Sequence, residues 1–450
     1  MSDIIAAVST GNQISAIGII RMTGEGCIQT AEKVFTLYNN KVLSDVPARK
    51  LVLGQLHDRF GRVIDQCMAV CSYAPHSYTG EDTVEFQCHG SPALLAAGLE
   101  ALYAAGARPA KRGEFTKRAF LNGHLDLTQA EAVIDLIEAD SADAAANAAG
   151  QVGGTLVKKL HPVYSDLTDI CSHFHAVLDY PDEDIEDFGF ERYLSTLKRS
   201  EKVLAGLLST YDRGRILRQG VSAAIVGRPN VGKSSLLNAL AGFDRVIVTD
   251  IPGTTRDTVE ETVMLGKTRL RLIDTAGIRQ TGDAIEAMGV ERSRQAAEQA
   301  DVIFFVCDGS QPLTGEDRAI MDGCKDKVVG IINKADLGCC VDKSDLPFEN
   351  VISICAKNGE NLEDVAQIVD KMFASDAPCD GSILTNARQF AAITKAKEAI
   401  TRAITTLGGY TPDAALLDVE DAMAAMGEVT GGTVREDITA RIFERFCVGK

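Results

Sequence analysis

The sequence is poor in aromatic residues and lacks the features that mark exported or membrane-spanning proteins. It contains no tryptophan, and aromatic residues make up 6% of its 450 residues. No apolar run approaches the roughly 20 residues that a helix needs to cross a bilayer. The N-terminal MSDIIAAVSTG shows no charged leader followed by an apolar stretch. We therefore expect a cytoplasmic protein that does not bind membranes.

A disulfide framework is also missing from the cysteine pattern. The twelve cysteines are spread along a long chain without the close spacing of a small secreted scaffold, and no CxxC pair occurs. The nearest approach to a metal-binding cluster is Cys171 with His173 and His175. We interpret the cysteines as reduced thiols that mostly serve as small buried hydrophobic side chains.

An overall positive charge is absent as well, which bears on nucleic-acid binding. The net charge of −17 argues against non-specific binding over the whole surface, because phosphate contacts need Lys and Arg. Residues 1–119 nevertheless carry 12 Lys and Arg against 11 Asp and Glu, so the acidic excess lies in the rest of the chain. A local basic run there is either a candidate RNA contact or an ordinary solvated face. It consists of Arg108, Lys111, Arg112, Lys117 and Arg118.

Length and composition indicate several globular domains. A chain of 450 residues exceeds one ordinary core, and 45% hydrophobic with 24% charged residues is typical of globular proteins. Short apolar stretches and a helical pattern near LLAAGLEALYAAG predict a mixed α/β first segment. The stretch from Leu127 to about Leu217 is predicted to be helical, with the acidic DYPDEDIEDF at 179–188 as a loop.

From Val221 the pattern changes to apolar strands separated by helices. The strand candidates are VSAAIVG, RLRLIDTAG, DVIFFVCDG, KVVGIINKAD and NVISICAK. Such alternation predicts a doubly wound parallel sheet with its ligand at the carboxyl ends of the strands. After Phe373 a linker leads back to helices from about Asn386 to Val448. We therefore expect an α/β domain inserted between two helical segments that pack on each other.

Residues 227–234, GRPNVGKS, lie between a predicted strand and a predicted helix. The pattern G-x-x-x-x-G-K-[ST] in that position surrounds phosphate groups with backbone N–H donors. Lys233 would then face the β- and γ-phosphates, and the Ser234 hydroxyl would bind Mg²⁺. The sequence therefore predicts a nucleoside triphosphate site.

Two further motifs follow in order at strand ends. In DTAG at 274–277, Asp274 would reach the metal through water and the Gly277 N–H would sense the γ-phosphate. In NKAD at 333–336, Asp336 can accept both hydrogen bonds from the guanine edge, which adenine cannot supply. Together the motifs resemble those of small GTPase domains. In the position of that family's Ser-Ala-Lys base loop, with Cys replacing Ser, stand Cys355, Ala356 and Lys357.

Two departures from Ras-like proteins bear on the mechanism. The position of the glutamine that orients the attacking water is Ile278, which cannot do so, and no arginine finger is recognisable. Asn230 together with TDIPGTTRD at 249–257 resembles GTPases that coordinate potassium where other enzymes place an arginine. In that class the cation is held by Asn230 and by the loop backbone at Thr249, Ile251 and Thr254, while Thr255 binds Mg²⁺. The alternative is that Asn230 is only a polar loop residue.

Segments along the whole chain resemble the MnmE (TrmE) family of tRNA modification GTPases. They are STGNQISAIGIIRMTG, SYTGEDTVEFQCHG, GEFTKRAFLNGHLDLTQAEAV, the VERS helix start and the final CVGK. The resemblance implies a multidomain α/β protein with an N-terminal α+β folate-binding and dimerisation domain at 1–119. It also implies an all-α helical domain built from 120–216 and 376–450, and an inserted Ras-like P-loop GTPase domain at 217–375.

The resemblance also implies an activity. With the FAD protein MnmG, members add an aminomethyl or carboxymethylaminomethyl group to carbon five of the wobble uridine in certain tRNAs. Methylene-tetrahydrofolate supplies the one-carbon unit, and formyl-tetrahydrofolate is an analogue of it. GTP hydrolysis needs Mg²⁺, is stimulated by potassium and by dimerisation of the G domains, and drives conformational changes. The implied partners are a second copy of the chain, MnmG in a heterotetramer or larger complex, and tRNA.

The implied GTP contacts lie in these motifs and in the loop before TTRD. They are Asn230, Val231, Gly232, Lys233, Ser234, Ser235, Thr249, Asp250, Ile251, Pro252, Gly253, Thr254, Thr255, Asp274, Thr275, Ala276, Gly277, Asn333, Lys334, Asp336, Cys355, Ala356 and Lys357. Glu286 matches the family glutamate that positions the hydrolytic water, which would compensate for Ile278. Without the family, Glu286 is a solvent-facing residue at a helix start.

Four further residues match folate-binding positions of the family, namely Arg21, Glu85, His124 and Lys450. A cation would pair with the glutamyl carboxylates of folate, and an acidic side chain could hydrogen-bond the pterin ring. His124 stands where many members have Lys, and it offers a hydrogen bond but no fixed charge. Without the family, Arg21 is a surface residue at a strand edge. Cys447 matches the cysteine that members require for tRNA modification but not for GTP hydrolysis.

Two other functions compete with this interpretation. A switch GTPase of ribosome assembly would carry a recognisable RNA-binding domain after the G domain, whereas this chain ends in acidic helices and CVGK. A folate-dependent methyltransferase acting without a partner would need its own catalytic base for carbon transfer. No such base and no flavin fingerprint is visible in the N-terminal third of the sequence.

Overall fold

The structure of this chain, a computed structural model, consists of two compact units. The first joins Met1–Tyr211 with Cys379–Lys450, and the second is Asp212–Pro378. The residues that the structure describes are 3–11, 13–38, 41–179, 190–243, 261–273, 297–324, 327–373, 378–407, 412–432, 442–444 and 446–449. Within these ranges, none of the helices is both long and apolar enough to cross a membrane.

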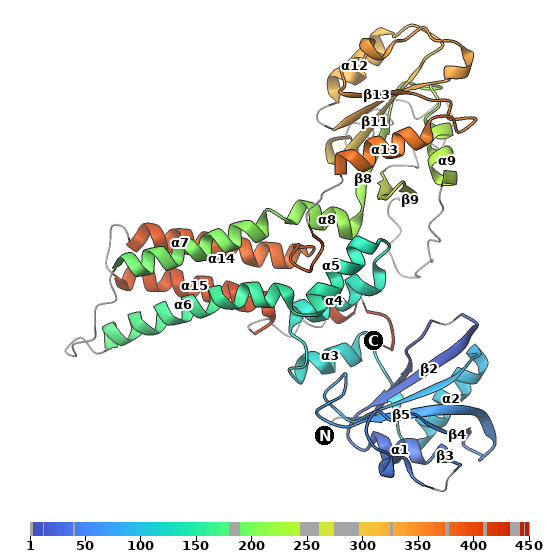
Figure 1. Ribbon diagram of the computed structural model, residues 1–450, viewed down its shortest axis with the longest axis vertical. Coiled ribbons are helices and arrows are strands. Elements are labelled where there is room, and N and C mark those ends of the chain that lie inside the picture. The colour runs from blue at the N-terminus through green and yellow to red at the C-terminus, as the bar shows by residue number, and fades with distance from the viewer. Residues whose placement is uncertain are drawn as a thin grey trace, which may run out of the picture. The chain divides into compact units, whose positions relative to one another are not determined.

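A seven-stranded sheet in the order β3-β4-β5-β6-β2-β1-β7 forms the N-terminal part of the first unit (Figure 1). Neighbouring strands are antiparallel except β1 and β7, which are parallel. The elements are β1 (Ile5–Val8), β2 (Ser15–Thr23), α1 (Cys27–Glu32), β3 (Phe35–Leu37), the short helix η1 (Leu43–Asp45), β4 (Val52–His57), β5 (Val63–Ser72), β6 (Thr83–Gly90), α2 (Pro92–Ala105) and β7 (Arg108–Pro109).

Alternation along the strands decides which face of this sheet is buried. Ile20 and Met22 of β2 and Phe86 of β6 point to the face that α1 and α2 cover, and all three are fully buried. Leu102 of α2 meets them in the same core. The intervening residues, Arg21 and Glu85 among them, therefore point to the opposite face.

Helices form the rest of the first unit. They are α3 (Glu114–Leu121), α4 (Leu127–Glu138), α5 (Ala142–Val152), α6 (Thr155–Asp179), α7 (Phe190–Leu208), α14 (Ala387–Leu407) and α15 (Pro412–Thr430). Helices α6, α7, α14 and α15 share one apolar core. The stripe on α6 recurs every three or four residues, as an amphipathic helix requires, through Leu156, Leu160, Val163, Leu167, Ile170 and Phe174.

Buried polar contacts fasten the returning chain to the helices that precede the second unit. The Asn147 amide donates to the Ile383 carbonyl (3.2 Å) and accepts the Gly381 N–H (3.2 Å). Arg388 of α14 forms a two-pronged ion pair with Glu131 of α4, with both N–O distances 2.8 Å. These contacts hold together segments that are more than 200 residues apart in the sequence.

The second unit is built on a six-stranded sheet in the order β13-β12-β11-β8-β10-β9. Its elements are α8 (Tyr211–Gln219), β8 (Val221–Val226), α9 (Lys233–Phe243), β9 (Glu261–Leu265), β10 (Thr268–Leu272), β11 (Val302–Asp308), α12 (Gly315–Gly323), β12 (Val328–Asn333), η2 (Ala335–Leu337), η3 (Lys343–Asp345), β13 (Asn350–Ser353) and α13 (Leu362–Phe373). Five strands are parallel, and β9 joins β10 as an antiparallel edge strand.

The predicted fold class is confirmed, with one strand missed. Each of the five predicted strands forms, and β8 and β11 are buried along their whole length, as expected for the centre of a parallel sheet. Strand β9 was not predicted, because ETVML is short and gives no clear alternation. The predicted acidic loop at 179–188 lies, apart from Asp179, outside the described residues. The predicted domain boundaries remain predictions.

None of the twelve cysteines forms a disulfide, and all are in the described part of the chain. Six are buried, in agreement with the interpretation as small hydrophobic side chains, and Cys171 is partly buried. Cys339, Cys340 and Cys447 are exposed, so that interpretation does not hold for them.

Candidate functional site

The phosphate-binding motif connects the carboxyl end of β8 to the first turn of α9. The Lys233 ammonium donates to the carbonyls of Gly227 (2.6 Å) and Arg228 (2.8 Å). Burial lowers the Lys233 pKa, and Glu316 opposes this shift. An ammonium has three N–H donors, so two hold the loop and one remains for a ligand. A phosphate there would supply the negative charge that the partly buried ammonium favours.

Unusual backbone angles give this loop its shape. Asn230 has φ 64° and Gly232 has φ 104°, both in the region that most residues avoid. A side chain on Gly232 would collide with the Asn333 amide. Glycine at 232 is therefore needed both for the backbone conformation and for the close approach of Asn333.

Asn333 ties the phosphate loop to the base loop. Its Nδ2 donates to the Val231 carbonyl (2.9 Å), and its Oδ1 accepts the Ala356 N–H (3.0 Å). Asn333 is buried at the end of β12, and Val231 and Ala356 are buried too. One side chain thus fixes the relative positions of two loops that follow different strands.

The other residues of the NKAD motif and Cys355 of the base loop lie around this link. The Lys334 ammonium contacts Asp308 (2.7 Å) and the Asn230 carbonyl (3.0 Å). The Cys355 thiol lies 3.2 Å from Asp336 Oδ1 and donates to it, so Cys fills the position of Ser with a weaker donor. Asp336 is exposed, with one carboxylate oxygen oriented by that thiol.

Three residues that support this edge were not predicted from the sequence. Asp308 ends β11 and holds Lys334, and an acidic residue directly after the apolar run VIFFVC was a signal for it. Arg228 pairs with the fully buried Asp317 (2.7 Å), which also completes the capping box with Thr314, the N-cap of α12. No local pattern connects these two residues, because they lie 89 positions apart.

Of the remaining predicted GTP contacts, three lie at this edge and the others lie outside the residues that the structure describes. Ser234, Ser235 and Lys357 are exposed at this edge, the first two in the opening turn of α9. The other members of the set lie outside the described residues. They are Thr249, Asp250, Ile251, Pro252, Gly253, Thr254, Thr255, Asp274, Thr275, Ala276, Gly277 and Glu286, as well as Ile278 and Lys450.

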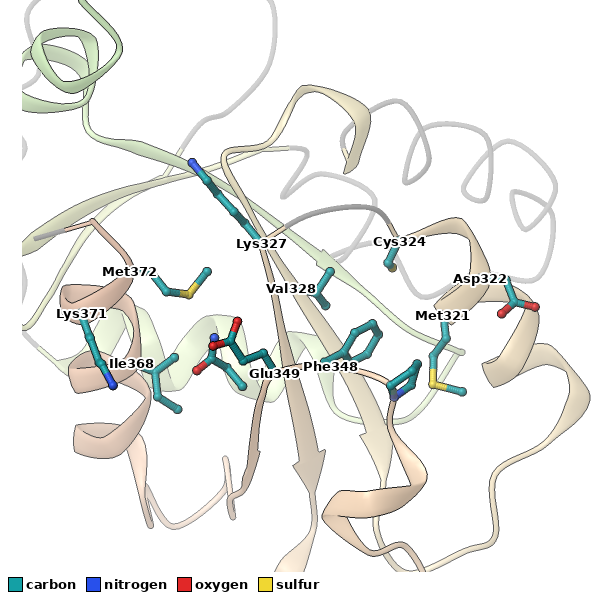
Figure 2. Close-up of a pocket in the computed structure, with 12 residues that line it drawn as sticks. Met321, Asp322, Cys324, Lys327, Val328, Phe348, Glu349, Ile368, Lys371 and Met372 are labelled. Atoms are coloured by element: carbon teal, nitrogen blue, oxygen red, sulfur yellow. The ribbon is translucent and has the colours of Figure 1, made fainter. Parts of the chain in front are cut away.

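A hollow of about 670 Å³ lies at the opposite end of the strands (Figure 2). Val328 and Asn350, which begin β12 and β13, line it together with Phe348, Lys327 and Lys371. Ligands of open α/β sheets bind at the carboxyl ends of the strands. We therefore do not assign the nucleotide to this hollow.

A second group of predicted residues meets on the N-terminal sheet. Arg21 of β2 and Glu85 of β6 are directly opposite each other and form an ion pair of 2.6 Å. The Arg21 guanidinium also lies over the rings of Tyr78 (5.3 Å) and Phe115 (5.7 Å). Strand β2 is flanked by β1 and β6, so the alternative interpretation of Arg21 as a strand-edge surface residue is wrong.

Because Arg21 and Glu85 are in contact, they cannot act at opposite ends of a ligand without separating. Tyr78 and Phe115 were missed in the sequence, although both are aromatic residues within segments that carried the resemblance. The Tyr78 hydroxyl is fixed by Thr116 (2.8 Å). The structure therefore shows one partly buried, aromatic-lined charge pair.

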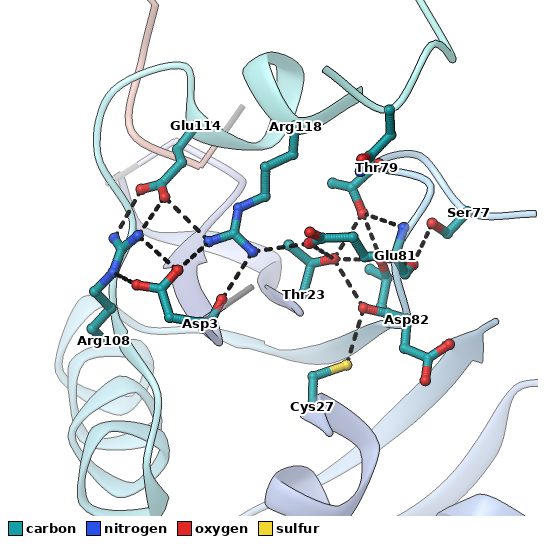
Figure 3. Close-up of polar contacts among 12 residues, drawn as sticks. Asp3, Thr23, Cys27, Ser77, Thr79, Glu81, Asp82, Arg108, Glu114 and Arg118 are labelled. Carbon is teal, nitrogen blue, oxygen red and sulfur yellow. Dashed lines mark hydrogen bonds and ion pairs between the residues drawn. The ribbon is translucent and has the colours of Figure 1, made fainter. Parts of the chain in front are cut away.

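A polar network beside this pair holds the loop at 77–82 against α3 (Figure 3). Arg118 donates to Asp3 (2.8 Å) and to Glu81 (2.9 Å), and Glu114 accepts from Arg108 (2.5 Å). The predicted basic run is thus not a uniform cationic patch. Arg108 and Arg118 are held in ion pairs with acidic residues, whereas Lys111 and Arg112 are exposed.

The last residues of the chain return to this region. Val448 forms a β-bridge with Arg112, the Cys447 carbonyl accepts the Gly113 N–H (3.3 Å), and the Gly449 carbonyl accepts from Ser9 (2.9 Å). The exposed Cys447 therefore lies next to the start of α3. His124 lies against Gly80 and is exposed. The described members of the predicted folate set and Cys447 all belong to the first unit.

The fold and the nucleotide edge define a class of protein. A strand, a glycine-containing loop, and a helix that begins with Lys-Ser form a P-loop. An Asn-Lys-x-Asp segment at the end of β12 lies beside it, bonded to the Cys-Ala-Lys loop. These features are those of a P-loop GTP-binding protein.

Comparisons with known proteins narrow the class to a family. Residues 4–124 match the model of the GTP-binding protein TrmE N-terminus, and residues 127–447 match the model of the MnmE helical domain. The chain is 40% identical over 465 residues to the tRNA modification GTPase MnmE of Heliobacterium modesticaldum. It is 40% identical over 453 residues to that of Aquifex aeolicus. Both alignments cover 100% of each chain, and this chain belongs to the MnmE family of tRNA modification GTPases.

Among solved structures, the chain is similar to Era of Aquifex aeolicus bound to GDP and AlF4⁻. The two are 27% identical, and the match covers 40% of this chain and 66% of that one. The TM-score is 0.27, so this likeness adds nothing to the assignment.

The link through Asn333 generates the first prediction. Asn333→Ala leaves the Val231 carbonyl and the Ala356 N–H without their partner, at a cost of about 1–3 kcal/mol, or roughly 5- to 150-fold in affinity. We expect weaker binding of a fluorescent GDP analogue by an amount in that range. Asn350→Ala, at the opposite end of the sheet, is the control and should bind as the parent does. Equal affinities of the two variants would mean that Asn333 does not hold the loops together.

Proposed function

We propose that this protein is a potassium-stimulated GTPase that acts with MnmG on carbon five of the wobble uridine in certain tRNAs. The product is the aminomethyl or carboxymethylaminomethyl derivative, and methylene-tetrahydrofolate supplies the carbon. The observation that carries the GTPase part is the Asn333 link between a loop suited to phosphate and a loop suited to guanine. The tRNA part rests on membership of the family.

The nucleotide edge fits GTP with Mg²⁺. The partly buried Lys233 is suited to phosphate, and the exposed carboxylate of Asp336 is suited to the N–H groups of guanine. The Ser234 hydroxyl, exposed in the first turn of α9, would hold Mg²⁺ together with Thr255. The ion supplies charge neutralisation on the β- and γ-phosphates. Further contacts would come from the 249–255 loop and from the DTAG motif.

Asn230 would hold potassium with the backbone of Thr249, Ile251 and Thr254. Asn230 is exposed and has φ 64°, and its carbonyl accepts a hydrogen bond from the Lys334 ammonium. An amide oxygen is a suitable ligand for a hard cation. A fixed cation at the phosphates would replace the charge of the missing arginine finger.

Glu286 is proposed to position the water that attacks the γ-phosphate, acting through a second water. The aliphatic Ile278 cannot orient that water, so another hydrogen-bonding group is needed. A carboxylate can accept the hydrogen bonds involved.

Arg21, Glu85, His124 and Lys450 are proposed to bind the folate. The partly exposed Tyr78 adds aromatic surface beside the charge pair, which fits a flat pterin ring with polar edges, and the fully buried Phe115 supports Arg21 from below. Glu85 could hydrogen-bond that ring, with Arg21 adjacent to it. Lys450, the residue after Gly449, would add a cation for the glutamyl carboxylates. His124 would contribute a hydrogen bond.

The partners are proposed from the family. A second copy of the chain would form a homodimer through the N-terminal domain, and MnmG with its FAD would complete a heterotetramer or larger complex. Cys447 is proposed to act in tRNA modification and not in GTP hydrolysis. Its exposure and its place beside α3 leave it accessible to a tRNA. We further propose that the protein acts in the cytoplasm.

Potassium dependence is the experiment that tests the GTPase mechanism. Steady-state GTP hydrolysis should be at least about tenfold faster in potassium chloride than in sodium chloride at equal ionic strength, because groups that stabilise transition-state charge contribute roughly 2.7–4 kcal/mol. Asn230→Ala should remove the difference. Asn358→Ala, an exposed asparagine of the base loop, should keep it. Equal rates of the parent protein in the two salts would refute the cation site.

The role of Glu286 leads to a separate prediction. Glu286→Ala should slow GTP hydrolysis by about 10²–10⁴-fold while GTP affinity stays close to that of the parent, because only the reacting water loses its partner. Single-turnover hydrolysis and nucleotide titration measure the two effects. The neighbouring acidic residue provides a control in Asp283→Ala. Weak GTP binding by Glu286→Ala would show that this residue is structural instead.

Cys447 separates the two activities. In a reconstituted reaction with MnmG, tRNA, GTP and methylene-tetrahydrofolate, Cys447→Ser should form no modified uridine but hydrolyse GTP at the parent rate. The exposed Cys340 provides the control, and Cys340→Ser should retain both activities. Loss of GTP hydrolysis in Cys447→Ser would contradict this division. Modification by the parent protein without MnmG would replace the partner-dependent model with a self-sufficient methyltransferase.

A further inference from the structure

The helical part of the first unit brings three metal-binding side chains together on one side of the bundle. Cys171 and His175 lie on α6, and Glu420 lies on α15. One ligand atom from each, a thiol sulfur, a ring nitrogen and a carboxylate oxygen, lies within 4.8 Å of the other two. His175 Nε2 and Glu420 Oε1 are already 2.9 Å apart. Nothing in the proposed GTPase or tRNA chemistry uses this group.

The arrangement follows from helix geometry. Positions i and i+4 share a face, so Cys171 and His175 point the same way, toward α15. His173, which lies between them in the sequence, is not part of the group. Its ring is 5.7 Å from the ring of Tyr193 on α7, because residues two apart do not face the same neighbour. Glu420, 245 positions from His175, takes its place.

The site is open to solvent on one side and packed on the other. Cys171 is partly buried against the core of the bundle, whereas the side chains of His175 and Glu420 are 50% and 43% exposed. An ion can therefore enter from water and still contact a partly buried thiol. Tetrahedral zinc bonds of about 2.0–2.3 Å put the donor atoms about 3.3–3.8 Å apart, so small side-chain rotations suffice.

We propose that Cys171, His175 and Glu420 bind one thiophilic divalent cation of the Zn²⁺ type, with the fourth position taken by water. Thiolate, imidazole and carboxylate are zinc ligands, and a thiolate disfavours Mg²⁺ and potassium. On binding, the sulfur–metal bond replaces the S–H bond and its proton passes to solvent. The His175–Glu420 hydrogen bond opens so that both atoms bind the ion.

The consequence is a cross-link between the two halves of the helical bundle. Helix α6 precedes the nucleotide-binding unit and α15 follows it. An ion that binds the folded chain and not the unfolded one stabilises the fold by mass action. The bound ion would therefore hold α15, which precedes the C-terminal residues, against α6.

A second cluster of metal-binding side chains occurs in the described residues, formed by Asp65, Cys67 and Cys88. All three are buried in the N-terminal sheet, and the Asp65 carboxylate is occupied by the N–H and ring of His89 (2.9 and 2.8 Å). An ion would have to enter the core and displace these bonds. The open site at Cys171, His175 and Glu420 is therefore the better candidate, and the buried cluster is the alternative that the experiment must exclude.

The test is titration of the reduced, nucleotide-free full-length protein with Co²⁺, a spectroscopic substitute for zinc. We expect a sulfur-to-cobalt charge-transfer band that saturates at one ion per chain, is displaced by Zn²⁺ and is accompanied by a higher melting temperature with Zn²⁺. Cys171→Ser should abolish the band. His175→Ala and Glu420→Gln should weaken binding at least about tenfold, since even outer-shell changes cost about 10–100-fold. Glu420→Gln can keep the hydrogen bond to His175, so it isolates the ligand role.

Two control variants distinguish the proposed site from the buried cluster. His173→Ala, on the same helix, and Cys67→Ser, in the buried cluster, should leave the band and the thermal shift unchanged. Absence of the band in the parent protein overturns the proposal, as does its persistence in Cys171→Ser. Loss of the band in Cys67→Ser instead would place the ion in the N-terminal sheet.

Discussion

The burial of apolar side chains between helices that precede and follow the nucleotide-binding unit is the interaction on which the rest of the structure depends. Helices α6 and α7 come before that unit, α14 and α15 come after it, and neither pair could cover its own apolar face. The return of the chain to this core is reinforced by the Arg388–Glu131 ion pair and by Asn147. Because α15 is held there, the final residues reach the start of α3 and the end of β1.

The nucleotide edge depends on side chains that bridge loops, since a parallel sheet by itself only delivers loop backbones to one edge. Asn333 joins the phosphate loop to the base loop, and Lys334 joins Asp308 to the Asn230 carbonyl. The two residues are adjacent at the end of β12. A substitution of either residue is therefore expected to alter the positions of both the phosphate loop and the base loop.

Features encoded by local patterns could be predicted from the sequence, whereas contacts between residues far apart in the chain could not. The parallel strands and the P-loop followed from apolar runs and a spaced glycine–lysine motif, and the fold class was predicted correctly. The antiparallel β9 was missed because its five residues carry no clear period. The pairing of Arg21 with Glu85 depends on strand order, and Glu420 reaches His175 across an insertion, so neither partner could be found by spacing.

Charge distribution connects the docked C-terminus to the proposed tRNA substrate. The chain is strongly acidic, and two of the five cations in the basic run are neutralised by Asp3, Glu81 and Glu114. Lys111 and Arg112 stay exposed, and Arg112 bridges Val448, the residue after Cys447. Phosphate contacts need such cations, and their attraction for a nucleic acid is greatest where acidic neighbours are few. A tRNA drawn to Lys111 and Arg112 would meet Cys447 at the same place. The position of that thiol follows from the helical core that returns the chain to the N-terminal sheet.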